Sequence, residues 1–354
     1  MQVVFRADAS TDIGTGHVMR CMTLARALAE QGARCDFICR AHEGHLIGFI
    51  REQGFAVHVL PLEPLASAVF DGTAHAPWLG ASQAQDAQAC EPVLTALQPD
   101  WLVVDHYALD ARWEQALAHA HGQLMVIDDL ADRPHVAQVL HDQTLGRDPA
   151  DYQAHVPSDC TLLCGSQFAL LRPEFAALRS GSLQRRSPPA FRQLLITMGG
   201  VDKDNATGRV LNALAKCALP ANCRVVVVMG PHAPHAARVQ VQASTFPWPT
   251  QVLSGVSHMA QLMADSDLAI GAAGATAWER CCLGLPSLML VLADNQRGLA
   301  QALAKTGAAQ VIEPTDLPRM DWSALLNMGP KAAALVDGEG VGRVVRTLRG
   351  LHAA

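Results

Sequence analysis

Continuous apolar runs alternate with amphipathic stretches along the first third of the chain. The apolar runs predict strands at residues 3–5, 35–39, 55–60, 101–104 and 124–127. The stretches between them predict helices at residues 17–31, 44–53, 83–97 and 111–120. Apolar strands that alternate with helices are typical of a parallel sheet covered on both faces, so we expect an α/β domain.

A second series of the same kind follows residue 190. Its apolar runs predict strands at residues 194–197, 224–229, 268–270 and 287–292. Its helices are predicted at residues 205–217, 258–264, 276–282 and 295–305. The polar, Pro-terminated stretch 180–190 is typical of an exposed linker, which predicts domains at 1–185 and 186–354. The amphipathic segment 340–351 is a candidate to pack back on the first domain.

Composition narrows the class of protein. A chain of 354 residues has room for two domains, and 27 Lys and Arg against 33 Asp and Glu leave a net charge of −6. We therefore expect no nucleic-acid partner. The ten cysteines lack a disulfide or zinc spacing, and no secretory signal precedes the first strand, so we expect a cytoplasmic protein with buried, reduced thiols. The longest apolar run, 286–293, is far shorter than the roughly 20 residues of a membrane span.

The loop after the first predicted strand carries candidate chemistry. Gly14 and Gly16 let the backbone turn sharply, and His17 stands at the helix start, where the helix dipole disfavours an imidazolium. A neutral histidine there is suited to act as a general base. The alternative is that the glycines only turn the chain and His17 only caps the helix. Asp8 either orients His17 or binds the loop backbone, and we favour the backbone role.

This loop is not a dinucleotide-binding fingerprint, because a third glycine is missing and no acid clearly ends the second strand. Farther along, Tyr107 follows a strand, where its phenol and ring suit a sugar. The alternative is a Tyr packed under a loop. Asp128 and Asp129 also follow a strand. Neighbours on a strand point in opposite directions, so we interpret this pair as loop-organising and not as a paired acid and base.

Two loops of the second half are candidates for binding an anion. Gly199 and Gly200 follow one strand, and Gly274, Ala275 and Thr276 follow another and open a helix. Bare amides at such positions attract phosphate groups, but the Lys of an ATP-binding P-loop is missing. The alternative is that these small residues serve only packing. The D-x-D patterns at 202–204 and 265–267 are interpreted as turn and helix-end residues, so we expect no required metal.

Five sequence blocks in order carry a family resemblance. They are 5–20 (with Arg6 to Ser10 and Ile13 to Arg20), 104–107, 127–129, 164–175 and 198–202. In these blocks the chain resembles the PseG family, the UDP-sugar hydrolases of pseudaminic acid synthesis. The likeness extends through most of the chain.

The resemblance implies two Rossmann-like domains facing a cleft, as in GT-B enzymes such as the MurG-type glycosyltransferases. It implies UDP-2,4-diacetamido-2,4,6-trideoxy-β-L-altropyranose as substrate, with inversion, no cofactor and His17 as the base for water. Glu279 would accept the ribose hydroxyls of UDP, and Asn295 and Gln296 would face the sugar. Arg6 is included among the substrate contacts.

Three rivals remain open from the sequence. A glycosyltransferase would pass the sugar to an acceptor, and a binding protein would keep the fold without turnover. A UDP-sugar 2-epimerase would change the stereochemistry at C2. The sequence leaves the oligomeric state and the exact sugar stereochemistry open.

Overall fold

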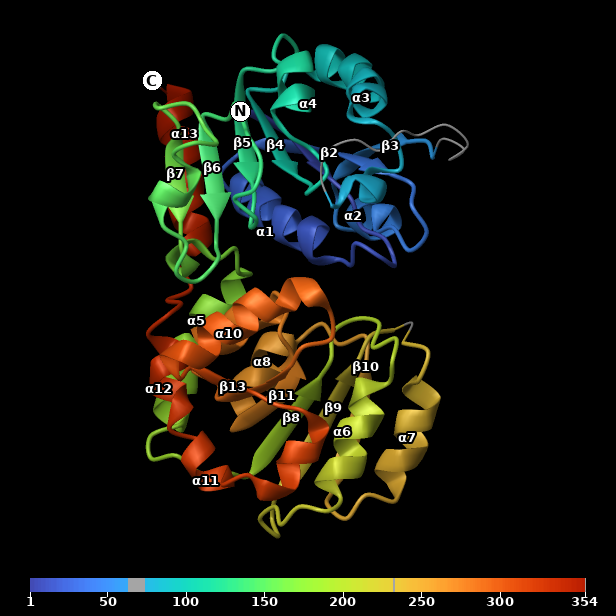
Figure 1. Cartoon of the computed structure of the whole chain (residues 1–354), viewed down its shortest axis with the longest axis vertical. Coiled ribbons are helices and arrows are strands. Elements are labelled where there is room, and N and C mark those ends of the chain that lie inside the picture. Colours follow the sequence, from blue (N-terminus) through green and yellow to red (C-terminus); the bar gives the residue numbers. More distant parts are fainter. Residues whose placement is uncertain (63–73, 232, 354) are drawn as a thin grey trace. The chain divides into compact units, whose positions relative to one another are not determined.

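The computed structural model describes residues 1–62, 74–231 and 233–353. The chain forms two compact units, one of Met1–Leu170 with Gly340–Ala354 and the other of Leu171–Glu339. Each unit is a parallel sheet with helices packed against it, which confirms the predicted α/β class (Figure 1).

The first unit contains a seven-stranded parallel sheet in the order β3-β2-β1-β4-β5-β6-β7. Its strands are β1 (Gln2–Ala7), β2 (Arg34–Arg40), β3 (Ala56–Leu60), β4 (Trp101–Asp105), β5 (Gln123–Ile127), β6 (Val139–Asp142) and β7 (Thr161–Cys164). Its α-helices are α1 (Gly16–Glu30), α2 (Ile47–Glu52), α3 (Gln83–Leu97), α4 (Ala111–Ala116) and α13 (Gly340–Ala353).

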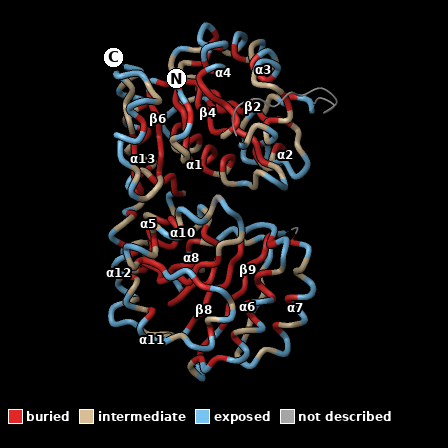
Figure 2. The backbone as a smooth tube through the Cα atoms, viewed as in Figure 1, coloured by how far each residue is buried: buried red, intermediate tan, exposed pale blue. Residues whose placement is uncertain are grey.

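Alternate residues of these strands serve two cores. Phe5 and Val103 pack on one face with α1 and α13, whereas Val4 and Leu102 pack on the other with α3 and α4. Successive strand residues point to opposite faces, so a sheet covered on both sides needs an unbroken apolar run. This requirement explains why the apolar runs of the sequence predicted the strands. Figure 2 shows β4 and β8 buried in their respective units.

The second unit contains a six-stranded parallel sheet in the order β10-β9-β8-β11-β12-β13. Its strands are β8 (Gln193–Thr197), β9 (Arg224–Met229), β10 (Thr250–Ser254), β11 (Leu268–Ala272), β12 (Ser287–Leu290) and β13 (Ala309–Val311). Its α-helices are α5 (Pro173–Arg185), α6 (Ala206–Leu214), α7 (Ala236–Ser244), α8 (Met259–Asp265), α9 (Thr276–Cys282), α10 (Arg297–Thr306), α11 (Trp322–Leu325) and α12 (Met328–Ala333).

The elements that the pattern did not predict are short or polar. Strand β6 ends in His141 and Asp142, and strand β10 has only two apolar residues, so neither stands out as an apolar run. Helix α2 begins at Ile47 and not at Gly44, because Gly44 has a positive φ of 79° that a helix does not allow.

The unit boundary lies between Leu170 and Leu171, earlier than the expected 185/186. Residues 180–185 are not a linker, because they form the end of helix α5 of the second unit, although most of the stretch 180–190 is exposed as expected. Ser182 donates to the carbonyl of Leu283 at 2.8 Å, and Arg186 donates to the carbonyl of Met263 at 2.8 Å. These two polar side chains bind carbonyls of neighbouring helices, a contact that the polarity of the sequence does not indicate.

The C-terminal helix α13 lies in the first unit. Val344, Val345 and Leu348 are fully or almost fully buried in the core that also holds helix α1. The candidate segment 340–351 therefore packs on the domain that the sequence suggested. Helix α1 carries His17, so α13 supports the helix that positions the candidate base.

Candidate active site

The direction of strand order reverses between β1 and β4 in the first sheet. In open α/β sheets, ligands bind beyond the carboxyl ends of the strands at such a switch point. The loop after β1 contains Gly14 and leads to His17, and β4 ends at Asp105. Parallel pairing of Ala7 with Asp105 brings these two loops together at one edge of the sheet.

His17 is the second residue of helix α1 and is 8 % exposed. Its Nδ1 lies 2.7 Å from Oδ1 of Asp105. An ionised carboxylate only accepts hydrogen bonds, so in the neutral imidazole Nδ1 carries the hydrogen and Nε2 presents a lone pair. Burial by itself raises the pKa of the Asp105 carboxyl, but Arg20 and His17 together hold that pKa well below its usual range. Asp105 therefore stays ionised beside the histidine.

Arg20 connects Asp105 to a second carboxylate. Its Nε and NH2 donate to the two oxygens of Asp105 at 2.6 and 2.8 Å, and its NH1 donates to Asp129 at 2.6 Å. The phenol of Tyr107 donates to the same Asp129 oxygen at 2.6 Å, and its ring meets the His17 ring edge-on at 4.5 Å. These contacts join five side chains in a closed network, namely His17, Arg20, Asp105, Tyr107 and Asp129. The Asp105 carboxylate holds the imidazole by a hydrogen bond, and the Tyr107 ring packs against it. We call it the His17 network.

The sequence did not single out Asp105 as the partner of His17. It stands two residues before the candidate Tyr107, but its contact with His17 spans 88 positions and depends on the β1–β4 pairing. The alternative role of Asp8, orienting His17, does not match the contacts. Asp8 accepts a hydrogen bond from the backbone N–H of Arg40, the last residue of β2, at 2.6 Å. It thus binds backbone, as we favoured, but that of the neighbouring strand and not that of its own loop.

The expected substrate contact of Arg6 is wrong in this structure. Its side chain is fully buried, with NH2 2.7 Å from Asp86 and NH1 2.8 Å from Asp8. A guanidinium enclosed by two carboxylates cannot reach a ligand, so Arg6 holds the sheet edge together. The residues that neighbour Arg6 in the sequence do not indicate this ion pair, because Asp86 lies 80 residues away.

The structure shows different reasons for the two glycines of the loop after β1. Gly14 has a φ of 78° and donates from its backbone N–H to the carbonyl of Ser10 at 2.9 Å, which closes the loop. Gly16 begins helix α1, and no atom lies within 4 Å of where a Cβ would stand. Conformation therefore requires glycine at Gly14, whereas Gly16 leaves open space beside the helix start.

Aromatic side chains that the sequence did not indicate border the His17 network. Trp78, on the 3-10 helix η2 (Ala76–Leu79), stacks on Tyr107 with centroids 5.9 Å apart and meets the His17 ring edge-on at 6.5 Å. Beside it lies a cavity of about 470 Å³. Its lining residues are Ser10, Thr11, Asp12, His42, Glu43, Pro77 and Trp78. The volume suits a small ligand, and the lining combines one aromatic face with hydroxyls and carboxylates, as sugar ligands require.

Asp128 and Asp129 bind different partners, as expected for successive residues after a strand. Asp129 belongs to the His17 network. Asp128 accepts from the phenol of Tyr152 at 2.8 Å and pairs with Arg133 at 2.8 Å. The pair organises two loops.

In the second unit, the first candidate anion loop differs from expectation. Gly199 and Gly200 are exposed, and Gly199 has a φ of 90°. The first amides of helix α6, however, are already bound by the Asp202 carboxylate, which accepts from Ala206 at 2.7 Å and from Thr207 at 3.0 Å. A side-chain carboxylate thus takes the place where an anion would meet this helix dipole.

In the second candidate anion loop, which contains Gly274, Ala275 and Thr276, no side chain of the described residues binds the first amides of the following helix α9. Gly274 and Thr276 are half-buried, and Ala275 is exposed. One turn along this helix, Glu279 keeps only 16 % of its side chain exposed and lies 3.5 Å from NH2 of Arg172. Burial raises the pKa of Glu279 against the opposing effect of Arg172. Sequence reasoning gave Arg172 no role, since it stands 107 residues from Glu279.

The loop before helix α10 contains the 3-10 helix η5 (Asp294–Gln296). The side-chain oxygen of Gln296 accepts from the backbone N–H of Leu292 at 3.0 Å and so closes the loop after β12. The side chain of Asn295 lies outside the described residues.

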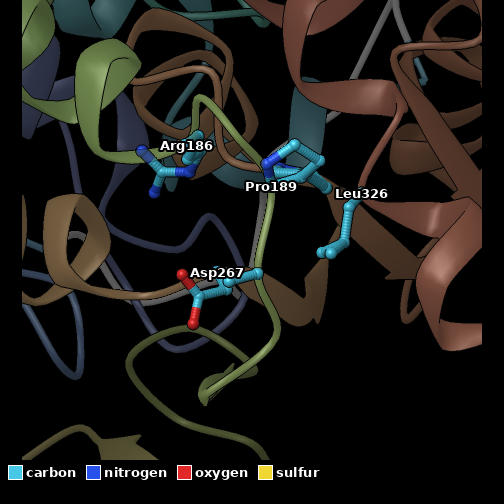
Figure 3. A pocket seen from close by; sticks show the side chains of 6 residues that line it. Arg186, Pro189, Asp267 and Leu326 are labelled. Atoms are coloured by element: carbon cyan, nitrogen blue, oxygen red, sulfur yellow. The ribbon is translucent and has the colours of Figure 1, made fainter.

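A small cavity marks the opposite edge of the second sheet (Figure 3). It has a volume of about 10 Å³, enough for about one water, and is lined by Arg186, Pro189, Ala190, Asp267, Pro286 and Leu326. Asp267 accepts from the backbone N–H groups of Arg192 and Gln193 at 2.8 Å each. It therefore ties strand starts together, at the edge away from ligands.

The part of the chain that the structure describes contains no group of three or more His, Cys, Asp or Glu side chains placed to hold a metal ion. Within residues 1–62, 74–231 and 233–353, every helix is too short or too polar to cross a membrane.

Comparison with known proteins adds to this geometry. Residues 193–328, within the second unit, match the glycosyltransferase family 28 C-terminal domain. The chain is 23 % identical to the UDP-2,4-diacetamido-2,4,6-trideoxy-beta-L-altropyranose hydrolase of Campylobacter jejuni, over 87 % of this chain and 97 % of the relative. The resemblance to the PseG family is confirmed.

Solved structures confirm the fold. Acinetobacter baumannii MurG aligns with a TM-score of 0.71 at 17 % identity, covering 99 % of each chain. The UDP-GlcNAc 2-epimerase of Neisseria meningitidis, solved with UDP-GlcNAc bound, aligns with a TM-score of 0.60 at 15 % identity over 99 % of this chain and 100 % of that one. The fold is thus that of the GT-B glycosyltransferases, as the sequence predicted.

Proposed function

We propose that this chain is a hydrolase that cleaves the anomeric C–O bond of UDP-2,4-diacetamido-2,4,6-trideoxy-β-L-altropyranose, giving UDP and the free sugar in the cytoplasm for pseudaminic acid synthesis. The His17–Asp105 pair at 2.7 Å carries the proposal, because it orients a base at the ligand edge of the first sheet. The similarity to the Campylobacter jejuni hydrolase over 87 % of the chain supports the choice of substrate.

In the proposed mechanism, Nε2 of His17 takes a proton from a water molecule as its oxygen attacks the anomeric carbon. The bond from this carbon to the UDP oxygen breaks on the opposite side, so the anomeric centre inverts. Asp105 stabilises the imidazolium that forms and holds its orientation. UDP leaves as an anion, so its departure needs electrostatic stabilisation more than a proton donor.

The two units have separate tasks in this proposal. The first supplies the base together with Tyr107 and Trp78 for the sugar. In the second, the amides of Gly274, Ala275 and Thr276 receive the diphosphate, and Gly199 and Gly200 contribute through their exposed backbone. Glu279 accepts the ribose hydroxyls, with Arg172 holding its carboxylate, and Asn295 and Gln296 face the sugar as in the family.

The test is to incubate the purified protein with this UDP-sugar and EDTA, without an acceptor, and to follow both products by mass spectrometry and NMR. We expect stoichiometric UDP and free sugar, with the inverted anomer first. The variant His17→Asn should bind UDP normally and lose turnover. His119→Asn, at a histidine whose side chain is 61 % exposed, is the matched control and should keep the wild-type rate.

A glycosyltransferase is the second candidate, favoured by the family 28 match of the second unit. It predicts UDP release only when an acceptor is added, and that result would exclude the hydrolase. A change at C2 before UDP release would indicate an epimerase. Binding of the UDP-sugar by folded protein without any turnover would indicate a binding protein.

A further inference from the structure

Arg280 is a buried cation that pairs with no carboxylate of residues 1–62, 74–231 or 233–353. Three arginines are among the largest fully buried side chains of the described residues, namely Arg6, Arg40 and Arg280. The first two share the carboxylate of Asp86, each with NH2 at 2.7 Å. Arg280 instead donates from NH2 to the carbonyl of Ala272 at 2.9 Å, and its Nε has no partner in the described part of the chain.

This difference appears in the electrostatics. Burial lowers the pKa of Arg280, with only weak opposition from Cys281 and Glu279. The pKa of Arg6 is raised despite its burial, because Asp8 and Asp86 stabilise the charge. A guanidinium remains protonated in either setting, so Arg280 keeps a buried positive charge that the surrounding protein does not neutralise.

Arg186 also forms no ion pair with a carboxylate of the described residues, but backbone carbonyls surround its guanidinium. It donates to the carbonyls of Met263 at 2.8 Å and Leu283 at 3.0 Å, at the ends of helices α8 and α9. Carbonyl ends of helices carry partial negative charge. Arg280 stands in the last turn of α9, but its side chain reaches back toward the start of the helix, where NH1 is 3.5 Å from Oγ1 of Thr276 and the helix dipole is positive.

Gly271 leaves the space that the Arg280 guanidinium occupies at the carboxyl ends of the strands. A Cβ at Gly271 would stand 2.5 Å from NH1 of Arg280 and 2.7 Å from the carbonyl oxygen of Thr197, so only glycine fits. Gly271 and Thr197 are paired residues of β11 and β8, the two strands between which the second sheet reverses its order. The guanidinium thus lies beneath the loop 272–276, at the switch point where ligands bind.

We propose that Arg280 is the built-in counter-charge for the diphosphate of a nucleoside diphosphate received by the loop 272–276. This inference rests on the proposed function for the identity of the ligand. Arg280 acts as a positioning residue: its charge attracts the anion through the loop, and its bond to the Ala272 carbonyl fixes the backbone that presents the amides. The anion in turn supplies the negative charge that the surrounding protein lacks.

The test is a series of ligands of rising charge. Binding of uridine, UMP, UDP and inorganic pyrophosphate is measured by calorimetry for the wild type, Arg280→Met, Arg280→Lys and the control Arg238→Met, an exposed arginine of helix α7. For Arg280→Met we expect about a tenfold loss for UDP and less than about a twofold loss for uridine. Arg280→Lys should restore most of the preference for UDP, and Arg238→Met should change nothing.

If Arg280→Met lost affinity equally for all four ligands, Arg280 would have a structural role and the inference would be overturned. An unchanged affinity for every ligand would overturn it as well. Arg280→Gln is the second variant, for the case that Arg280→Met does not fold. It removes the charge but keeps an N–H donor in the side chain, so UDP binding should weaken more than uridine binding, and an equal effect on both would also reject the inference. If the wild type binds no UDP, the proposed function itself fails. If it turns over the UDP-sugar but these variants show no charge dependence, only the role of Arg280 fails.

Discussion

Nδ1 of His17 lies 2.7 Å from the Asp105 carboxylate, although 88 positions separate the two residues in the sequence. Strand pairing between β1 and β4 brings them together, and Arg20 fixes the carboxylate from its other side. The imidazole therefore has one tautomer and one orientation before any ligand arrives. This preorganisation makes the pair a testable element of the proposed hydrolysis.

Replacing Asp105→Asn should lower kcat about 100-fold or more, the range in which a general base contributes. An amide can donate to Nδ1 and so place the hydrogen on Nε2, where it blocks proton transfer. Steady-state kinetics on the UDP-sugar would measure the loss, and KM should change little. Asp132→Asn, at a half-exposed carboxylate that pairs with Arg133, is the control. A kcat near that of the wild type would remove Asp105 from the proposed mechanism.

Replacing Arg20→Met should destabilise the first unit by about 3–5 kcal/mol near pH 7, because the buried Asp105 and the partly buried Asp129 lose their partner. Arg20 lowers the pKa of Asp105, so its stabilisation is present above the unfolded pKa of about 3.9. It is lost as the pH falls below that value toward the native pKa. Urea unfolding of both proteins should show a stability gap at pH 7 that narrows at pH 3. A gap that stays constant with pH would contradict this coupling.

Replacing Glu279→Gln should weaken UDP binding about tenfold, since hydrogen bonds from hydroxyls to a charged carboxylate are stronger than those to an amide. The variant should bind 2′,3′-dideoxy-UDP as the wild type does, because that ligand lacks both hydroxyls. Burial raises the pKa of Glu279, so wild-type affinity for UDP should begin to fall at a higher pH on acidification than for an ordinary carboxyl. Glu174→Gln, at the exposed partner of Arg172, is the control. Equal losses for both nucleotides would place Glu279 elsewhere.

Replacing Trp78→Ala should raise KM for the UDP-sugar about tenfold, because an aromatic platform contributes roughly 0.5–1.5 kcal/mol beyond its buried area. The inhibition constant of UDP alone should not change, since Trp78 belongs to the first unit, to which we assign the sugar. Trp248→Ala in the second unit is the matched aromatic control. An increase in the UDP inhibition constant would contradict this division of tasks.

Local patterns determined most elements and the loops that carry the chemistry. The predicted ranges 83–97, 224–229 and 276–282 coincide with α3, β9 and α9, because helix and strand periodicity depends on neighbouring residues alone. His17 could be singled out for the same reason, since its glycine-rich loop and helix start are contiguous in the chain.

Only the tertiary structure decided the partners of the charged groups. The pairing of His17 with Asp105 and of Arg6 with Asp86 depends on which strands pair and which helix faces meet. The same packing gives Arg280 a backbone carbonyl as its partner, and no carboxylate among the described residues. The unit to which α5 and α13 belong depends on the same packing. Such contacts join residues far apart in the sequence, and their energies arise from burial and geometry that a local pattern does not contain.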